Sequence, residues 1–149
     1  MLDYESEEQV GELHGLVTPG RFGHLLDGLG PYYKNAELAV ERNNHGHSAL
    51  NTLSNTCYEK QHRPNGKLGW PNDTKTKPVM INGLAAAIAS GSLTIHHSSA
   101  LVDECFSYVA LDGGATGAQP GRHDDPVIAA AIAWQVRQRP RPSFLIARA

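Results

Sequence analysis

Cysteine and long apolar runs are the two features that this sequence has least of. Its two cysteines, Cys57 and Cys105, are far apart and show no Cys-x-x-Cys spacing, so the sequence indicates neither a zinc ribbon nor a disulfide framework. We expect both thiols to lie in or near the hydrophobic core. No apolar run approaches the roughly 20 residues that span a bilayer. The first residues are acidic rather than signal-like, so we expect a cytoplasmic protein with no membrane segment.

Positive charge is also scarce for a protein that would bind nucleic acid. The formal net charge is −2, whereas a nucleic-acid-binding domain is usually basic. An acidic metal site would lower the net charge of a nuclease, so the net charge neither indicates nor excludes one. No Gly-x-x-x-x-Gly-Lys-Ser/Thr loop is present to bind nucleotide phosphates. The histidines at 45, 47, 96 and 97 have no recognised zinc spacing, so we expect no structural zinc.

Length and composition predict one globular domain. The 149 residues are 40% hydrophobic and 19% charged, which is typical of a folded chain. We assign residues 1–138 to the domain and residues 139–149 to an extended or disordered tail. The alternation of strands and helices after an antiparallel start predicts an α/β fold with a mixed sheet.

The individual elements follow from apolar spacing and from cap and turn residues. We expect a hairpin over residues 2–14, with its turn at 5–8, and strands at 37–41, 57–58 and 93–95. We expect helices at 18–30, 45–55, 74–90, 98–109 and 124–137, the first capped by Thr18 and ended by Gly30-Pro31. In the helix at 98–109, one apolar stripe is predicted: Leu101, Val102, Cys105, Phe106 and Val109. Residues 61–73 are expected to form an exposed loop or hairpin, and residues 112–121 a glycine-rich loop.

A carboxylate at the end of a predicted strand is the first candidate for chemistry. Residues 38–40 form an apolar run typical of a buried strand, and Glu41 follows directly. Ligands of open α/β sheets bind at the carboxyl ends of strands, which favours a functional role for Glu41. The alternative is a surface acid paired with Arg42 or Lys34.

Two adjacent carboxylates, Asp124 and Asp125, come at the predicted start of the last helix. Aspartate is favoured as a helix cap and in the first turn, which explains one of them. The second carboxylate of the pair is then free to face a site. The pair is preceded by His123 and followed by Pro126. Together with Glu41, these acids would form a site of hard oxygen ligands that suits Mg²⁺ or Mn²⁺.

Several segments together resemble a known family. They are Ala39-Val40-Glu41-Arg42-Asn43-Asn44-His45-Gly46, Gly69-Trp70, Thr76-Lys77-Pro78 and Gly121-Arg122-His123-Asp124-Asp125. Their order and spacing, from about residue 2 to about residue 136, resemble the C-terminal nuclease domain of the large subunit of tailed-phage terminases. The resemblance implies a ribonuclease H-like fold, in which helices flank a mixed sheet. It also implies a phage or prophage protein in a bacterial host cell.

The resemblance implies an endonuclease that cuts concatemeric double-stranded DNA during packaging. Glu41 and Asp125 would hold the Mg²⁺ or Mn²⁺ ions, with Asp124 as a helper or cap. Two ions about 4 Å apart activate water and stabilise the leaving oxygen in such reactions. His123 would assist proton transfer or contact phosphate, or else is a solvated loop residue. The implied partners are the terminase motor domain, the small terminase subunit and the portal.

Basic residues around Gly69-Trp70 predict a contact with the DNA backbone. They are Arg63, Lys67, Lys75 and Lys77, and an ordinary solvated loop is the alternative. Asn44 and His45 are secondary candidates for a direct DNA contact. Asn43, Asn44 and Gly46 are also typical of a turn, because Asn and Gly tolerate left-handed backbone. We expect Trp70 to pack in the protein rather than to stack on bases.

Two parts of the resembled family are missing from this sequence. The family's nuclease begins with a central strand that carries the first catalytic aspartate, followed by a hairpin. Residues 2–15 resemble that hairpin, so we expect the first strand to be lacking, and Asp3 is a poor substitute for the aspartate. The ATP-hydrolysing motor is absent too.

With fewer ligands the metal would be held less well, so we expect weak or no nuclease activity from this chain alone. One alternative is a non-catalytic prophage remnant, or a DNA- or protein-interaction module that keeps the fold. Another is a related ribonuclease H-like nuclease such as a junction resolvase. The segments at 69–70 and 76–78 favour a terminase over a resolvase, by resemblance.

Overall fold

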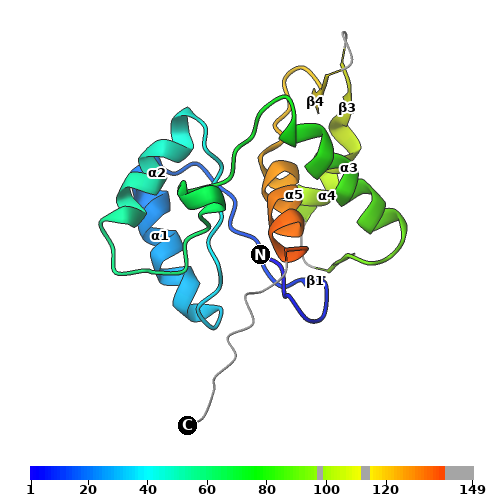
Figure 1. The fold of residues 1–149 in the computed structure, drawn as a ribbon. Coiled ribbons are helices and arrows are strands. Elements are labelled where there is room, and N and C mark those ends of the chain that lie inside the picture. Colours follow the sequence, from blue (N-terminus) through cyan, green and yellow to red (C-terminus); the bar gives the residue numbers. More distant parts are fainter. Residues whose placement is uncertain (97–98, 112–114, 140–149) are drawn as a thin grey trace.

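A computed structural model gives the fold as two groups of helices. It describes residues 1–96, 99–111 and 115–139, apart from the side chains of residues 44 and 99. Helices α1 (Pro19–Tyr32) and α2 (Asn44–Ser54) form a first lobe, and α3 (Thr76–Ala89), α4 (Ser99–Ser107) and α5 (Asp125–Arg137) form a second (Figure 1). A single 3₁₀ turn, η1 (Pro64–Gly66), lies between α2 and α3 in the chain. None of the helices in these ranges is long and apolar enough to cross a membrane.

The strands are short and form two separate sheets. Strand β1 (Glu8–Gln9) pairs in parallel with β2 (Thr94–Ile95), and β3 (Tyr108–Ala110) pairs antiparallel with β4 (Thr116–Ala118). Leu2 adds an antiparallel bridge to Gln9, so both kinds of pairing meet at β1. The mixed α/β class is therefore confirmed. A single sheet that unites these strands is not formed within the described ranges.

The predicted N-terminal hairpin is present near its turn. The N–H of Asp3 donates to the carbonyl of Glu8 (2.8 Å), and that of Val10 donates to the carbonyl of Met1 (3.0 Å). The Asp3 carboxylate accepts the N–H groups of Glu5 and Ser6 across the turn, and these hydrogen bonds lower the pKa of Asp3. Asp3 therefore serves the turn itself, which agrees with its rejection as a substitute catalytic acid.

Segment 38–41 is extended but is only half-buried, and it forms no regular strand. Leu38 forms an isolated parallel bridge with Gln61, and Glu41 forms another with Trp70. The two partners lie at opposite ends of the loop 61–70, so no continuous ladder can develop. This loop is exposed only in its middle, because Gln61, His62 and Trp70 are buried. The prediction of an exposed loop over residues 61–73 was therefore wrong for residues 61–62 and 69–70, which are buried.

The first lobe is held by close contact between its two helices. Thr18 caps α1 as predicted, accepting the N–H of Arg21, but the helix continues through Pro31 to Tyr32. At Gly23 a Cβ atom would lie 2.7 Å from the Thr52 Cβ and 2.9 Å from the Ala49 carbonyl oxygen of α2. The helices can approach this closely only because residue 23 has no side chain.

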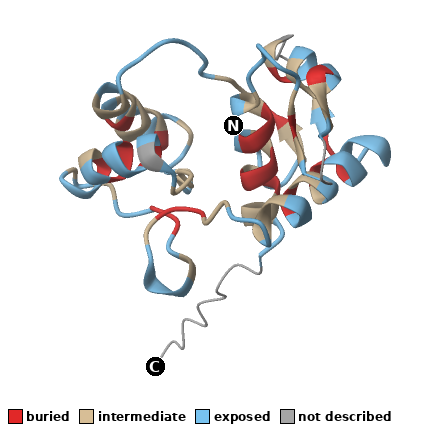
Figure 2. Ribbon diagram, turned by 90° about the horizontal axis from the view of Figure 1, so that it is seen from above, coloured by how far each residue is buried: buried red, intermediate tan, exposed pale blue. Residues whose placement is uncertain are grey.

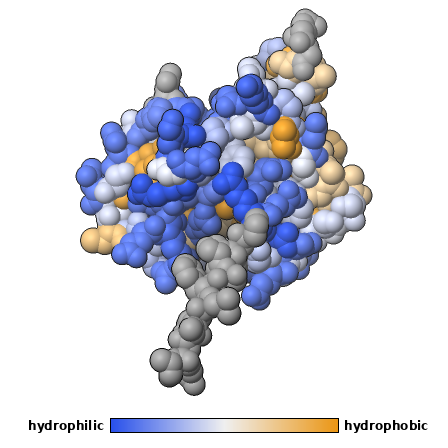
Figure 3. Space-filling model, in the orientation of Figure 1, coloured by the Kyte–Doolittle hydropathy of each residue, from blue (hydrophilic) through white to orange (hydrophobic). Residues whose placement is uncertain are grey.

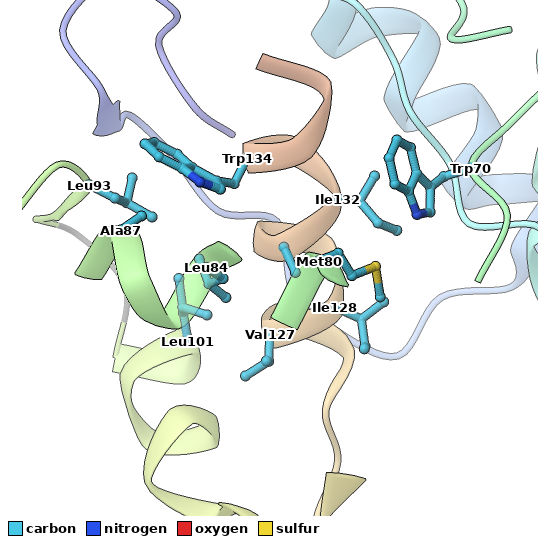
Figure 4. Packing of buried hydrophobic residues seen from close by; sticks show 11 residues of the cluster. Trp70, Met80, Leu84, Ala87, Leu93, Leu101, Val127, Ile128, Ile132 and Trp134 are labelled. Atoms are coloured by element: carbon cyan, nitrogen blue, oxygen red, sulfur yellow. The ribbon is translucent and has the colours of Figure 1, made fainter. Parts of the chain in front are cut away.

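The second lobe contains the main hydrophobic core, in which α5 packs against both α3 and α4 (Figures 1 and 4). Its buried members come from α3, α4, α5 and two connecting segments: Trp70, Met80, Leu84, Ala87, Leu93, Leu101, Val127, Ile128, Ala131, Ile132 and Trp134. Figure 2 shows buried residues along α5, as expected for the central helix of this lobe.

Four predictions for particular segments were wrong. Residues 57–58 form no strand, and Cys57 is exposed, whereas Cys105 packs against the core. Helix α4 ends at Ser107, so Val109 belongs to β3. Only one face of α4 meets α5, which leaves Phe106 84% exposed and Val102 exposed as well. Residues 116–118 of the predicted glycine-rich loop form β4. Ser98, residues 112–114 and most of the tail lie outside the described residues.

The contact between α1 and α2 predicts opposite effects for two glycine substitutions in α1. Gly23→Ala should lower the free energy of unfolding by about 1–3 kcal/mol, because the new methyl group collides with α2. Gly28→Ala is the matched control: a Cβ there meets no atom within 4 Å, so alanine should raise stability by about 0.5–1 kcal/mol. Urea unfolding followed by circular dichroism measures both. Equal stability of the two variants would contradict this packing.

Candidate functional site

Glu41 is held by side-chain amides rather than by a cation. Its Oε1 accepts a hydrogen bond from Asn72 Nδ2 (2.6 Å), and its Oε2 accepts one from Asn43 Nδ2 (2.9 Å). In the described part of the chain it makes no ion pair with Arg42 or Lys34. The alternative of an ordinary surface ion pair is therefore not what the structure contains. The amides fix the orientation of the carboxylate without cancelling its charge.

Asn43 connects the Glu41 carboxylate to the start of α2. Its Nδ2 donates to Glu41, and its Oδ1 accepts the N–H of Gly46 (2.6 Å) as the N-cap of the helix. A Cβ atom on Gly46 would lie 1.8 Å from the Glu41 carbonyl oxygen, so only glycine fits there. Asn43 is extended (φ −117°), and residues 44 and 46 already belong to α2, so the predicted turn over residues 43–46 is replaced by the capped start of the helix. His45 is exposed in the first turn of α2, and the side chain of Asn44 lies outside the described structure.

Asp124 and Asp125 come at the start of α5, as predicted. Asp124 occupies the N-cap position, but its carboxylate makes no capping hydrogen bond. Its Oδ2 instead lies 3.6 Å from Lys77 Nζ of α3. Asp125 is exposed in the first turn, where the positive end of the helix dipole favours a carboxylate. His123 is exposed in the loop that precedes them.

A third carboxylate, Glu104 of α4, lies close to this pair and was missed by the sequence reasoning. Burial raises its pKa, the backbone N–H of Val127 acts in the opposite direction, and the charges of Asp125 and Asp124 raise the pKa further. Its Oε2 is buried and has no hydrogen-bond partner in the described structure. The only signal in the sequence was a glutamate directly before Cys105 in a helix predicted to be half-buried.

The segment from Trp70 to Lys77 connects the two groups of acids. Trp70 pairs with Glu41 through its backbone, Asn72 binds the Glu41 side chain, and Lys77 reaches Asp124. The carboxylates of these acids would offer only oxygen atoms to a cation, which suits Mg²⁺ or Mn²⁺. The described residues include no group of three or more His, Cys, Asp or Glu side chains that could hold a metal ion. The convergence of Glu41 with Asp124 and Asp125 on one ion therefore stays a prediction.

The predicted DNA-contacting residues have different surroundings. Arg63 and Lys67 are exposed on either side of η1, and Lys75 is exposed at the start of α3. Lys75 lines an open pocket of about 220 Å³ whose other walls are Trp70, Thr76, Val79, Met80 and Gln135. Lys77 is half-buried against Asp124, with its Nζ 5.9 Å from the centre of the Tyr108 ring. Lys77 is therefore a partner of the acids, whereas the other three are accessible to a phosphate.

Trp70 packs in the protein, as expected. Its side chain is 6% exposed and belongs to the core of the second lobe. Its ring stacks on His62, with the centroids 5.6 Å apart, and the Arg139 guanidinium lies 5.1 Å from the ring centre. The buried His62 in turn binds Glu37 through Nδ1 (2.5 Å). These contacts surround the indole, so it is not available for stacking on bases.

The pKa of Glu104 predicts how a substitution there changes stability with pH. The unfolded chain loses this proton near the ordinary value of 4.5, whereas the folded chain holds it to higher pH. Stability is therefore lost as pH rises above that value. Glu104→Gln removes the penalty, so the variant should gain stability relative to the parent chain between about pH 4 and pH 7.

Urea unfolding of Glu104→Gln and of the parent chain at about pH 4 and pH 7 measures this difference in stability. Asp103→Asn, at an exposed acid of the same helix, is the matched control and should change little at either pH. A Glu104→Gln variant that gains nothing at pH 7 relative to pH 4 would contradict the assignment.

Comparison with known proteins adds no relative. Neither the protein-family models nor the curated proteins give a match to this chain. The resemblance to terminase nucleases therefore rests on the motif segments in the sequence.

Proposed function

We propose that this chain is a nuclease domain of the terminase large-subunit type, with a ribonuclease H-like ancestry. Its substrate would be concatemeric double-stranded DNA, cut by hydrolysis with Mg²⁺ or Mn²⁺. The observation that carries the proposal is the environment of Glu41. A carboxylate at the end of an extended apolar segment, held by two amides and by backbone pairing, is pre-organised in a way that a solvated surface acid is not.

The start of α5 supplies the second part of the proposed site. Asp125 is exposed and free of the capping role, and Lys77 fixes its neighbour Asp124. Glu41 and Asp125 would hold the cations, and Asp124 would help. When bound, two such ions activate a water molecule and stabilise the leaving oxygen. His123, which is exposed and directly precedes the acids, would accept or donate a proton.

Exposed basic residues support the choice of DNA as the substrate. Arg63, Lys67 and Lys75 lie on the chain segment that also carries Trp70 and Asn72. Hydrophilic residues of both signs of charge cover most of the face shown in Figure 3, so this view alone does not distinguish a DNA-binding surface. With a net charge of −2, the chain alone should bind DNA weakly and with strong salt dependence. The motor domain, small subunit and portal of a complete terminase would then supply much of the affinity.

A second candidate function is a non-catalytic remnant or an interaction module that binds DNA or a packaging protein. Two observations favour it. The part of the chain that the structure describes gathers no set of three metal-binding side chains of the His, Cys, Asp and Glu types. Its strands also form two small sheets instead of one. Both candidates use the same basic residues, so only cleavage separates them.

Nicking of supercoiled plasmid in Mn²⁺ tests the proposed function. The chain should nick slowly, EDTA should stop the reaction, and Glu41→Gln and Asp125→Asn should each reduce the rate by about 100-fold or more. Glu59→Gln, at an exposed acid outside the site, should leave the rate unchanged. DNA binding in filter assays without any nicking would favour the remnant. Nicking that is unaffected by both site substitutions, or neither nicking nor DNA binding, would contradict the proposed function.

A further inference from the structure

The amide of Asn72 is bound on one side and unpaired on the other. Its Nδ2 donates to Glu41 Oε1 at 2.6 Å, while its Oδ1 is buried and has no hydrogen-bond partner in the described structure. A buried carbonyl oxygen without a donor destabilises the fold, because it has lost its hydrogen bonds to water. The reverse orientation of the amide would place two acceptor oxygens against each other, so Glu41 determines which end of Asn72 faces it.

The backbone around Asn72 is fixed on both sides. Trp70 pairs with Val40 and Arg42 through hydrogen bonds of 2.7 and 2.8 Å. The carbonyl of Pro71 accepts from Thr76 Oγ1 (2.8 Å), and Asp73 Oδ1 accepts the N–H groups of Lys75 and Thr76 (2.9 Å each). Asn72 is therefore held beside Glu41 by a rigid turn and not by its own hydrogen bond alone.

The unpaired oxygen lies within reach of the carboxylate. The oxygen and nitrogen of one amide are joined through a single carbon, so Asn72 Oδ1 is at most about 5 Å from Glu41 Oε1. Two oxygen ligands of one Mg²⁺ ion lie about 3 to 4 Å apart, since each metal–oxygen distance is about 2.1 Å. Each Glu41 oxygen also keeps one lone pair beyond the hydrogen bond that it accepts. To share one ion, the two oxygens would have to approach each other by at most about 2 Å.

We propose that Asn72 completes the cation site at Glu41 in two ways. Its amide N–H orients the Glu41 carboxylate, and its Oδ1 is an oxygen ligand for a divalent cation shared with that carboxylate. Amide carbonyls are ordinary ligands of hard cations. The inference rests on the proposed function, because a cation at Glu41 is what gives the unpaired oxygen a partner. Residue 72 lies outside the segments that carry the terminase resemblance.

Mn²⁺ titration of the full ¹⁵N-labelled chain tests this inference directly by NMR. Paramagnetic broadening should affect the side-chain amide signals of Asn72 and Asn43 first. Asn82, exposed on α3, is the matched control and should stay sharp at the same Mn²⁺ concentration. An Asn72 signal that stays as sharp as that of Asn82 would overturn the proposal.

Calorimetric Mn²⁺ affinity of four variants separates this inference from the proposed function. Glu41→Gln and Asn72→Ala should each weaken binding by about 10- to 100-fold. Asn72→Asp keeps an oxygen ligand but loses the N–H that orients Glu41, so it should bind more tightly than Asn72→Ala, and Asn82→Ala should match the parent.

The possible results distinguish failure of this inference from failure of the proposed function. No Mn²⁺ binding by the parent chain, or equal binding by Glu41→Gln, overturns the metal site of the proposed function together with this inference. Binding that is weakened in Glu41→Gln but unchanged in Asn72→Ala overturns the inference alone. If Asn72→Ala does not fold, by circular dichroism, the broadening in the parent chain decides, and an Asn72 signal as sharp as that of Asn82 overturns the inference.

Discussion

The position of the candidate site depends on Trp70, whose side chain and backbone belong to different parts of the fold. The indole is buried in the core of the second lobe, while the backbone N–H and C=O bind Val40 and Arg42. A buried tryptophan removes about 150–250 Å² from water, which is among the largest contributions that one side chain can make. That burial holds segment 38–42 against α3 and α5. Because Asn43 follows directly and caps α2, the same contact also positions the first lobe.

The acids of the site are stabilised by three different means, and the difference matters for cation binding. Neutral amides bind Glu41, Lys77 pairs with Asp124, and burial favours the protonated form of Glu104. Amides satisfy the hydrogen-bonding capacity of a carboxylate but leave its negative charge intact. Lysine and a bound proton each reduce the charge that a cation would meet. We therefore expect Glu41, assisted by Asn72, to be the stronger attractor of a divalent cation in this chain.

Local signals in the sequence predicted the helices well and the strands poorly. Thr18-Pro19 and the acids before α5 mark helix starts within a few residues, because capping depends on neighbours in the chain. Segment 38–41 was predicted as a regular strand and β3 as the end of a helix. Both predictions were wrong because strand pairing depends on distant partners, here residues 61 and 70 for the first and residues 116–118 for the second. The same limit applies to the site. Glu41 and Asp125 could be selected from their places at the ends of elements, whereas Asn72, Lys77 and Glu104 acquire their roles only through tertiary contacts.

The central claim is that Glu41 and Asp125 serve one cation site although they lie far apart in the sequence. Anomalous diffraction at the manganese edge, from crystals of the chain grown with Mn²⁺, tests it most directly. The account predicts one manganese peak, or two about 4 Å apart, in contact with Glu41, the Asn72 carbonyl oxygen and Asp125. A map without a peak at Glu41, or with manganese only at Asp124 and Asp125 while Glu41 stays on its two amides, would contradict it.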